Sequence, residues 1–492
     1  MYLNITTRAN DRKYLSIVHG YRDEYGKVKK KTIKSLGYLD ELQKKYDDPI
    51  SYFKSIAKDM DEKRKLEQTG YSISINKNEK LLPGFKGTKN FGYAALVKVY
   101  HELGINNFIK NRQRHTNDNF DANAIMQLIA YVHLISNHSD KSSFSSRHLL
   151  FEKNNYTEKE FYQSLMFLYK HKTNLQTWLN EEMKIYYDRD DTLIYYNIHN
   201  YCSPSHVIKI GVFTDKNNIP VTYELFPCTS NYSSAYRPDF AEIKSAFKMN
   251  RMITVSDKAI LNGDSIWKII NTPSNDGYIF NIPVHSTCRE LKQYILNEEE
   301  YEWVNGEYKR KSRISSRAIE ITLKNGEKTK KIIEEKQIVF YSNKYAKRAK
   351  SNAFDGYYVL FTSELHQDDD KIINTYRNLW NIERRFRLTR STLEIRPEHI
   401  SVHHYIEMHL MKCFMSYILI KMLEIKLDCK YDAESIIDSI SSSTCININE
   451  NLYILSYYDE VLKDIGEKTG IPFDNKIMSL QNIKNILSNA KK

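Results

Sequence analysis

The sequence predicts a mixed α/β protein (α+β overall), in which a β-rich insertion interrupts the central sheet. Three observations predict this class. Runs of alternating apolar residues follow one another from residue 192, helical periodicity precedes them, and two Asn-Gly pairs mark hairpins between residues 287 and 350. The chain of 492 residues is long enough for several units, and its 41% hydrophobic content excludes a disordered protein.

The first 70 residues are expected to form a small β module and a charged helix. Apolar and polar residues alternate in short runs up to residue 39, and the turn-forming residues 23–27 separate two of these runs. Residues 48–68 have the composition of a charged helix. Residues 84–185 predict a helical region, because apolar residues recur at helical spacing and Gly104 ends the first helix.

Residues 190–286 contain the first part of the predicted core. Three consecutive strands, a helix and a fourth strand are expected at 192–198, 207–214, 219–226, 240–248 and 252–256. This order is that of a ribonuclease-H-like mixed sheet, although other mixed folds share it.

A basic, β-rich insertion occupies residues 287–350 and separates the two parts of the core. Asn305-Gly306 and Asn325-Gly326 each lie between strand-like runs, which is a strong hairpin signal. The second part of the core, residues 351–425, is expected to contain a strand, a long helix that begins near Asp368, and an apolar helix. Residues 426–492 are expected to form a helical C-terminal tail.

Positive charge is concentrated in two segments. The formal charge is +12; residues 309–350 hold 14 basic and 4 acidic residues, and residues 1–39 hold 9 basic and 3 acidic residues. Two focused basic surfaces suit a polyanion such as nucleic acid, and the alternative is a pair of solvated hairpins. The sequence has no apolar run of 18 residues, no export signal and no CxxC pair, so we expect a cytoplasmic protein without a membrane span.

The long helix of the second core part has a chemically informative face. Four residues share this face by helical spacing: Tyr376, Glu383, Arg387 and Arg390. A carboxylate among guanidinium groups suits a divalent metal ion beside a phosphodiester, and the alternative is an exposed helix with a Glu383–Arg387 salt bridge. Asp257 follows a buried strand, at the end where α/β folds place their sites; a helix cap is the alternative role.

Several segments, in this order along the chain, resemble a known family. They include Arg12-Lys-Tyr-Leu-Ser-Ile-Val18, Asn218-Ile-Pro-Val-Thr-Tyr-Glu-Leu-Phe-Pro227, Val255-Ser-Asp-Lys258 and, most specific, Leu379-Trp-Asn-Ile-Glu-Arg-Arg-Phe-Arg-Leu-Thr-Arg390 with Arg396-Pro397. The last segment matches a tyrosine-arginine-glutamate-lysine signature. On these residues the chain resembles bacterial insertion-sequence transposases of the DDE class, and the resemblance runs through most of its length.

The resemblance implies two Mg²⁺ or Mn²⁺ ions between three carboxylates, where water and then a 3′-hydroxyl attack a phosphodiester. Asp257 and Glu383 match the second and third carboxylates, and Asn197 stands at the position of the first. An asparagine offers one neutral oxygen, so the metal pair would be weakened. Asp191 is about 20 Å away along an extended strand, which is too far for it to substitute. Leu379 also replaces an arginine of the signature, and the hypothesis is a degenerate copy.

DNA is the partner that the resemblance implies. Element ends would bind the N-terminal β module and the helical region 84–185, and a homodimer is expected on DNA. The predicted phosphate contacts are Lys309, Arg310, Lys311 and Arg313 in the insertion, with Tyr376, Arg387 and Arg390 on the long helix. The alternatives are a DNA-binding relic or repressor without chemistry, and a metal-dependent nuclease without strand transfer.

Overall fold

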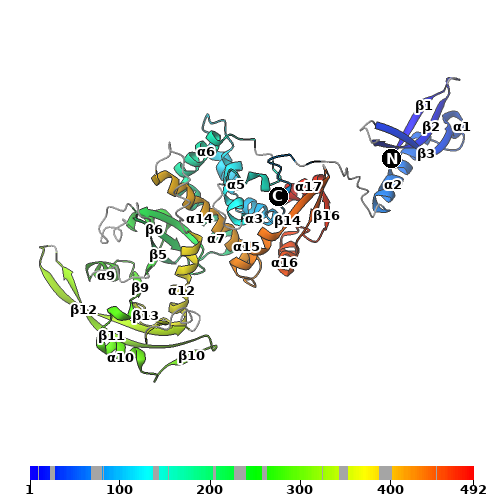
Figure 1. The fold of residues 1–492 in the computed structure, drawn as a ribbon. Coiled ribbons are helices and arrows are strands. Elements are labelled where there is room, and N and C mark those ends of the chain that lie inside the picture. The colour runs from blue at the N-terminus through cyan, green and yellow to red at the C-terminus, as the bar shows by residue number, and fades with distance from the viewer. Residues whose placement is uncertain are drawn as a thin grey trace. The chain divides into compact units, whose positions relative to one another are not determined.

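The structure is a computed structural model, and the chain divides into two compact units, Met1–Pro83 and Gly84–Lys492 (Figure 1). The residues that it describes are 1–8, 10–22, 28–67, 80, 82–136, 143–152, 155–202, 207–226, 240–256, 263–323, 325–342, 353–386, 402–449 and 451–492.

The N-terminal unit is a three-stranded antiparallel sheet with a helix against it. Its elements are β1 (Tyr2–Thr7), β2 (Lys13–Arg22), β3 (Val28–Tyr38), α1 (Leu39–Leu42) and α2 (Pro49–Glu67), and β2 is the central strand. Leu15, Ile17 and Val18 of β2 are buried, as are Phe53 and Ala57 of α2. Residues 15–18 of the central strand are all buried, so this short run, and not a strict alternation, contributes the small apolar core of the unit. The strands and the charged helix that the sequence predicts here are confirmed.

A nine-stranded sheet forms the centre of the second unit, in the order β10-β11-β12-β13-β9-β8-β5-β6-β7. The strands are β5 (Leu193–Cys202), β6 (Val207–Thr214), β7 (Pro220–Phe226), β8 (Arg251–Ser256), β9 (Gly277–Asn281), β10 (Glu302–Val304), β11 (Tyr308–Thr322), β12 (Lys328–Ser342) and β13 (Tyr357–Thr362). β8 pairs in parallel with β5 and β9, and the other neighbours are antiparallel. The mixed α/β class is confirmed, and the strands of the predicted insertion continue this sheet.

Two turns fix the hairpins of the insertion. Asn305 and Gly306 have φ values of 48° and 70°, and Gly326 has φ 86°. Left-handed φ at two successive residues is what a tight hairpin turn needs, and Asn-Gly tolerates it best. The hairpins predicted at both Asn-Gly pairs are therefore present.

Helices cover both faces of this sheet. They are α8 (Phe240–Phe247), α9 (Gly263–Ile270), the short η2 (Val284–Ser286), α10 (Arg289–Leu296) and α12 (Asp369–Arg385). Ile253 and Val255 of β8 share a core with Ile372 of α12, whereas Met252 of β8 shares a core on the other face with Phe247 of α8. The side chains of a strand alternate between faces, so α12 and α8 lie on opposite sides of β8.

The helices between residues 94 and 187, together with α14, share one large hydrophobic core with the β6–β7 edge of the sheet. They are α3 (Ala94–Glu102), α4 (Ile105–Gln113), α5 (Ala122–Ile135), η1 (Arg147–Leu149), α6 (Glu158–Lys170), α7 (Lys172–Tyr187) and α14 (Val402–Lys426). The apolar α14 packs on α3, α5, α6 and β7. Among the described residues, no helix is long and apolar enough to cross a membrane. The helical region predicted from residue 84 is confirmed as helical.

The C-terminal segment corrects a prediction, because it is not purely helical. It contains α15 (Ala433–Ser442), β14 (Thr444–Asn449), β15 (Leu452–Leu455), α16 (Glu460–Thr469), β16 (Ile477–Ser479) and α17 (Leu480–Ala490). Three of its strands join β4 (Thr88–Asn90) in a sheet of order β16-β15-β14-β4. These strands are three to six residues long, and β14 pairs with a segment about 350 positions earlier. Short runs stabilised by distant partners leave little local periodicity.

A buried ion pair joins the helical region to the sheet. The Nε atom of Arg189 lies 3.1 Å from Oδ2 of Asp215, and these side chains are 1% and 0% exposed. Other guanidinium nitrogens of Arg189 donate to Asn180 Oδ1 and to the carbonyl oxygen of Ile219, at 2.5 and 2.9 Å. Asp215 accepts two backbone N–H bonds at 2.9 Å in the β6–β7 turn. Both charges are thus compensated within the fold.

His101 at the end of α3 predicts a pH dependence of stability. Burial, with Lys491 and Lys110 nearby, lowers the pKa of His101 from 6.5 to about 4. The unfolded chain therefore binds one more proton between pH 6.5 and 4, and stability falls as the pH falls through this window. Between pH 6.5 and 4, we expect the His101→Gln variant to lose about 1–2 kcal/mol less folding stability than the parent does. This figure allows for the partial exposure of His101. Thermal midpoints measured from pH 7 to 4 check this, and equally steep curves for both proteins would contradict it.

Candidate active site and nucleic-acid interface

Asn197 lies in the interior of the nine-stranded sheet. It is on β5, opposite Val212 of β6 and Val255 of β8, and is 2% exposed. Its amide nitrogen donates to Thr214 Oγ1 at 3.3 Å. The side chain can therefore offer one neutral oxygen to a ligand. Thr214 has no sequence signal that would have marked it as this neighbour.

The helix α12 covers the sheet face on which Asn197 lies. Asp368 caps this helix by accepting the N–H of Lys371 at 3.1 Å, and acidic residues fill its first turn, as the sequence predicts. Tyr376 and Leu379 of α12 share a core with Val255. Position 383 is one turn beyond Leu379 in the same helix. The side chain of Glu383 lies outside the described residues.

Three other predicted site residues also fall outside the description. β8 ends at Ser256, directly before Asp257, and α12 ends at Arg385, before Arg387 and Arg390. The structure thus describes the backbone that leads to Asp257 and that carries Glu383, together with the whole of Asn197.

Tyr376 is fully buried, so its ring does not face solvent. Its ring is 6.4 Å from that of Phe340 and 6.5 Å from that of Tyr358, measured between centroids. Leu379, at the arginine position of the signature, is 1% exposed in the same core. A ring at this place cannot stack on a nucleic-acid base unless the core opens.

Two lysines predicted to contact phosphate are held inside the protein. Lys309 pairs with Glu298, and its Nζ lies 4.6 Å from the ring centroid of Tyr301. Lys311 is 3% exposed and donates to the carbonyl oxygen of Asn297 at 2.6 Å. Burial lowers the pKa of Lys311. These ammonium groups therefore hold residues 297–299, which follow α10, against β11.

The two predicted arginine contacts of the insertion are likewise paired. Arg310 donates to Asp370 at 2.6 Å, and this hydrogen bond is the main cause that lowers the pKa of Asp370. Arg313 donates to Gln337 at 3.0 Å and to Glu290 at 3.3 Å. Arg310 therefore ties the insertion to the first turn of α12. The contact of these four cations with DNA stays a prediction.

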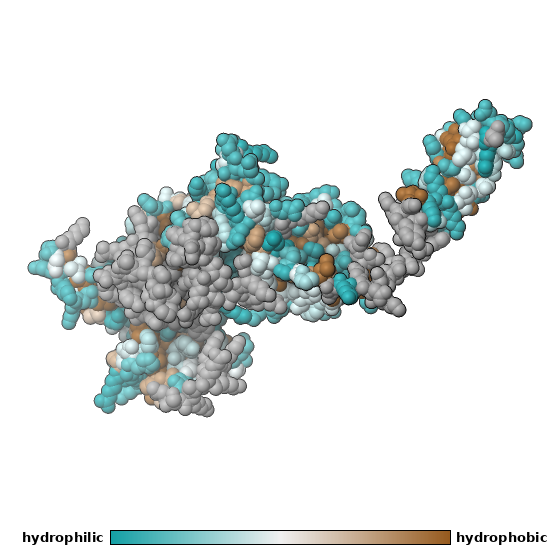
Figure 2. Space-filling model, turned by 45° about the horizontal axis from the view of Figure 1, so that its top comes forward, coloured by the Kyte–Doolittle hydropathy of each residue, from teal (hydrophilic) through white to brown (hydrophobic). Residues whose placement is uncertain are grey.

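A basic surface that is open to solvent lies on β3 of the N-terminal unit. Every residue of β3 from Val28 to Ser35 is exposed, and the run includes Lys30, Lys31 and Lys34. A cation lies beside an exposed aromatic ring on this sheet, because Lys30 Nζ is 5.8 Å from the ring centroid of Tyr2. Figure 2 shows hydrophobic residues among hydrophilic ones on the surface of this unit. Cations beside exposed aromatic rings are typical of nucleic-acid-binding surfaces.

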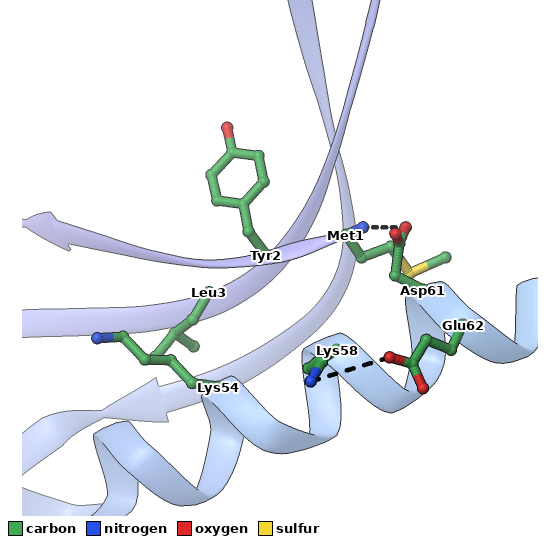
Figure 3. Close-up of a pocket in the computed structure, with 7 residues that line it drawn as sticks. All are labelled: Met1, Tyr2, Leu3, Lys54, Lys58, Asp61 and Glu62. Atoms are coloured by element: carbon green, nitrogen blue, oxygen red, sulfur yellow. Dashed lines mark hydrogen bonds and ion pairs between the residues drawn. The ribbon is translucent and has the colours of Figure 1, made fainter. Parts of the chain in front are cut away.

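Neither of the two pockets described next is lined by a predicted site residue. One pocket of about 420 Å³ lies between β1 and α2, where the amino group of Met1 pairs with Asp61 and Lys58 lies 4.0 Å from Glu62 (Figure 3). A second, of about 880 Å³, is lined mainly by α6. In the described part of the chain, no three His, Cys, Asp or Glu side chains are grouped so that they could hold a metal ion.

Comparison with known proteins gives one family match. Residues 3–70 match the family described as IS1634 family transposase, N-terminal domain. No curated protein matches the chain. Among solved structures, the chain is similar to piggyBac transposase in its synaptic complex with hairpin DNA, with 8% identity, 81% of this chain and 84% of that chain covered, and a TM-score of 0.34. The similarity of this chain to a transposase family therefore rests on residues 3–70.

Proposed function

We propose that the chain is a DNA transposase of the insertion-sequence type, whose cleavage and strand transfer are impaired by Asn197. The observation that carries the proposal is the layout around β5. Asn197 lies on the internal strand β5, β8 beside it leads into Asp257, and α12 on the same face contains position 383. Three positions far apart in sequence thus belong to adjoining elements.

The strand order supports a ribonuclease-H-like core. β7, β6 and β5 are antiparallel neighbours, and β8 and β9 follow in parallel. This arrangement agrees with the core that the resemblance to DDE transposases implies. The match of residues 3–70 to a transposase N-terminal domain supports the same assignment independently of the core.

The described donor set fits a divalent metal pair only in part. Two such ions, when bound, would act as Lewis acids toward water and the scissile phosphodiester. Asn197 supplies a neutral amide oxygen where an anionic ligand is expected, and its nitrogen is engaged with Thr214. Hard cations bind neutral oxygen less tightly than carboxylate. We therefore propose a metal site that binds divalent ions less tightly than a site with three carboxylates would.

Cleavage of DNA that carries element ends with flanking sequence tests the proposal. Mn²⁺-dependent cutting at the ends, followed by joining to a target, supports a transposase. Cutting without joined products would favour the metal-dependent nuclease. Binding without cutting, even after Asn197 is replaced by aspartate, would favour the relic or repressor.

The exposed strand β3 predicts where DNA is held. We expect Lys30→Glu with Lys31→Glu to weaken binding to duplex DNA at least tenfold and to lower the salt slope by about 2, because two phosphate neutralisations are lost. Fluorescence anisotropy at several salt concentrations measures both quantities. Lys44→Glu with Lys45→Glu is the matched control, since these lysines are also consecutive and exposed in the same unit. Equal effects of the two double variants would contradict a specific role for β3.

A further inference from the structure

The outer half of the β11–β12 hairpin has one covered face and one open face. Ile319, Ile321 and Ile333 are buried on the covered face, where they share a core with Ile266 of α9. The open face carries the cross-strand pairs Ser316/Glu334, Ala318/Ile332, Glu320/Lys330 and Thr322/Lys328, and at its inner end the exposed Ile314 lies opposite Lys336, which is mostly covered. These ten residues are called the outer hairpin face.

The centre of the outer hairpin face is apolar. Ile332 is 75% exposed at the centre, and Ile314, which is 56% exposed, lies in the pair at the inner end of the face. Ala318, directly opposite Ile332, is exposed as well. Covering the Ile332 side chain in an interface would remove apolar surface from water, which is favourable.

The charges on this face are arranged symmetrically about Ile332. Lys330 and Glu334 lie two residues before and two residues after it, both are exposed, and neither has an ion pair among the described residues. Lys328 pairs with Glu320 at 2.7 Å, and Lys336 pairs with Asp369 at 2.5 Å. The two unpaired charges have opposite signs, and the three lysines and two glutamates of the face leave a net charge of only +1. A polyanion is therefore a poor fit, whereas a two-fold copy of the same face is complementary.

We propose that the outer hairpin face packs against the same face of a second copy of this chain, about a two-fold axis that passes Ile332. In this arrangement Ile332 contacts Ile332 of the other copy, and each Lys330 lies opposite a Glu334. The face is two strands wide and five residues long, which is smaller than a standard stable interface. The association is thus weak and depends on protein concentration. It does not rest on DNA cleavage, and the homodimer expected on DNA could use it.

Sedimentation of the full chain without DNA, from about 1 to 100 μM protein, tests the proposal. The parent is expected to self-associate, and Ile332→Lys is expected to be monomeric throughout. Ile185→Lys is the matched control, because Ile185 of α7 is 73% exposed and lies outside this face; it should associate as the parent does. A monomeric parent, or unchanged association of Ile332→Lys, would overturn the proposal.

A charge exchange tests the two-fold geometry. Lys330→Glu and Glu334→Lys should each weaken association at least fivefold, because like charges then face each other across the axis. The double variant restores opposite signs and should return to within twofold of the parent. A double variant as weak as the single ones would overturn the symmetric arrangement. Circular dichroism of every variant confirms that the fold is retained, and cleavage assays are not needed for any of these outcomes.

Discussion

Asn197→Asp is expected to raise Mn²⁺-dependent cleavage of element ends by about 100-fold or more. The added carboxylate would supply the anionic oxygen that the site lacks, and 100-fold corresponds to about 2.7 kcal/mol of transition-state stabilisation. The position is already suited to the change, because the Thr214 hydroxyl beside Asn197 can donate to a carboxylate as well as accept from an amide. Initial rates of end cleavage under single-turnover conditions measure the effect.

The same substitution has a readout that does not depend on catalysis. A carboxylate at a position that is 2% exposed is unfavourable without a counter-ion. We therefore expect Asn197→Asp to lower the thermal midpoint in the presence of a chelator and to recover it with Mn²⁺. Asn217→Asp, in the exposed turn between β6 and β7, is the control that should show neither response. If the parent cleaves as fast as Asn197→Asp, impairment by Asn197 is excluded.

Arg189→Leu is expected to reduce the free energy of unfolding by about 3–5 kcal/mol, because it leaves Asp215 buried without its partner. The substitution also removes the bonds to Asn180 and Ile219. Urea denaturation followed by circular dichroism measures the loss.

Two further variants define the origin of this effect. Lys216→Met breaks a solvent-exposed pair with Asp190 at 2.7 Å, and we expect a change below about 1 kcal/mol. Adding Asp215→Asn to Arg189→Leu should recover part of the loss, because the orphaned charge is removed. A loss below about 1 kcal/mol for Arg189→Leu alone would show that solvent reaches Asp215.

Local backbone requirements were predictable from the sequence. Asn305 and Gly306 adopt the left-handed conformations that their hairpin needs, and Gly104 has φ 62° at the end of the first helix. Asp368 caps α12 where the acidic run predicts a helix start. In each case the backbone conformation is determined by residues that are close together in the sequence, so a short sequence pattern is enough to predict it.

Features set by distant contacts were not predictable. The charge of residues 309–350 indicates a basic surface, yet Lys309, Arg310 and Lys311 are bound to carboxylates or carbonyl oxygens from other segments. Tyr376 shares a helical face with the site positions, and this face turns out to lie against the sheet. Residue counts and helical spacing do not specify which surface a neighbouring element covers.

The candidate site was only partly accessible to sequence reasoning. Its positions came from the resemblance to a family, whereas the burial of Asn197 and its bond to Thr214 came from the structure. Local patterns place residues on elements, and the register between β5 and β8 determines which of those residues become neighbours.

The pairing of β4 with β14 has a consequence for folding during synthesis. Asn90 donates its amide to the carbonyl oxygens of Ile440 and Ser441, so the edge of this sheet joins segments 350 and 351 positions apart. A ribosome that adds about 5–20 residues per second would separate the appearance of these segments by tens of seconds. The N-terminal unit can fold in that interval. The apolar side chains around α3 stay exposed until the C-terminal residues that cover them have been synthesised. We therefore expect nascent chains to depend on chaperones until β14 has emerged.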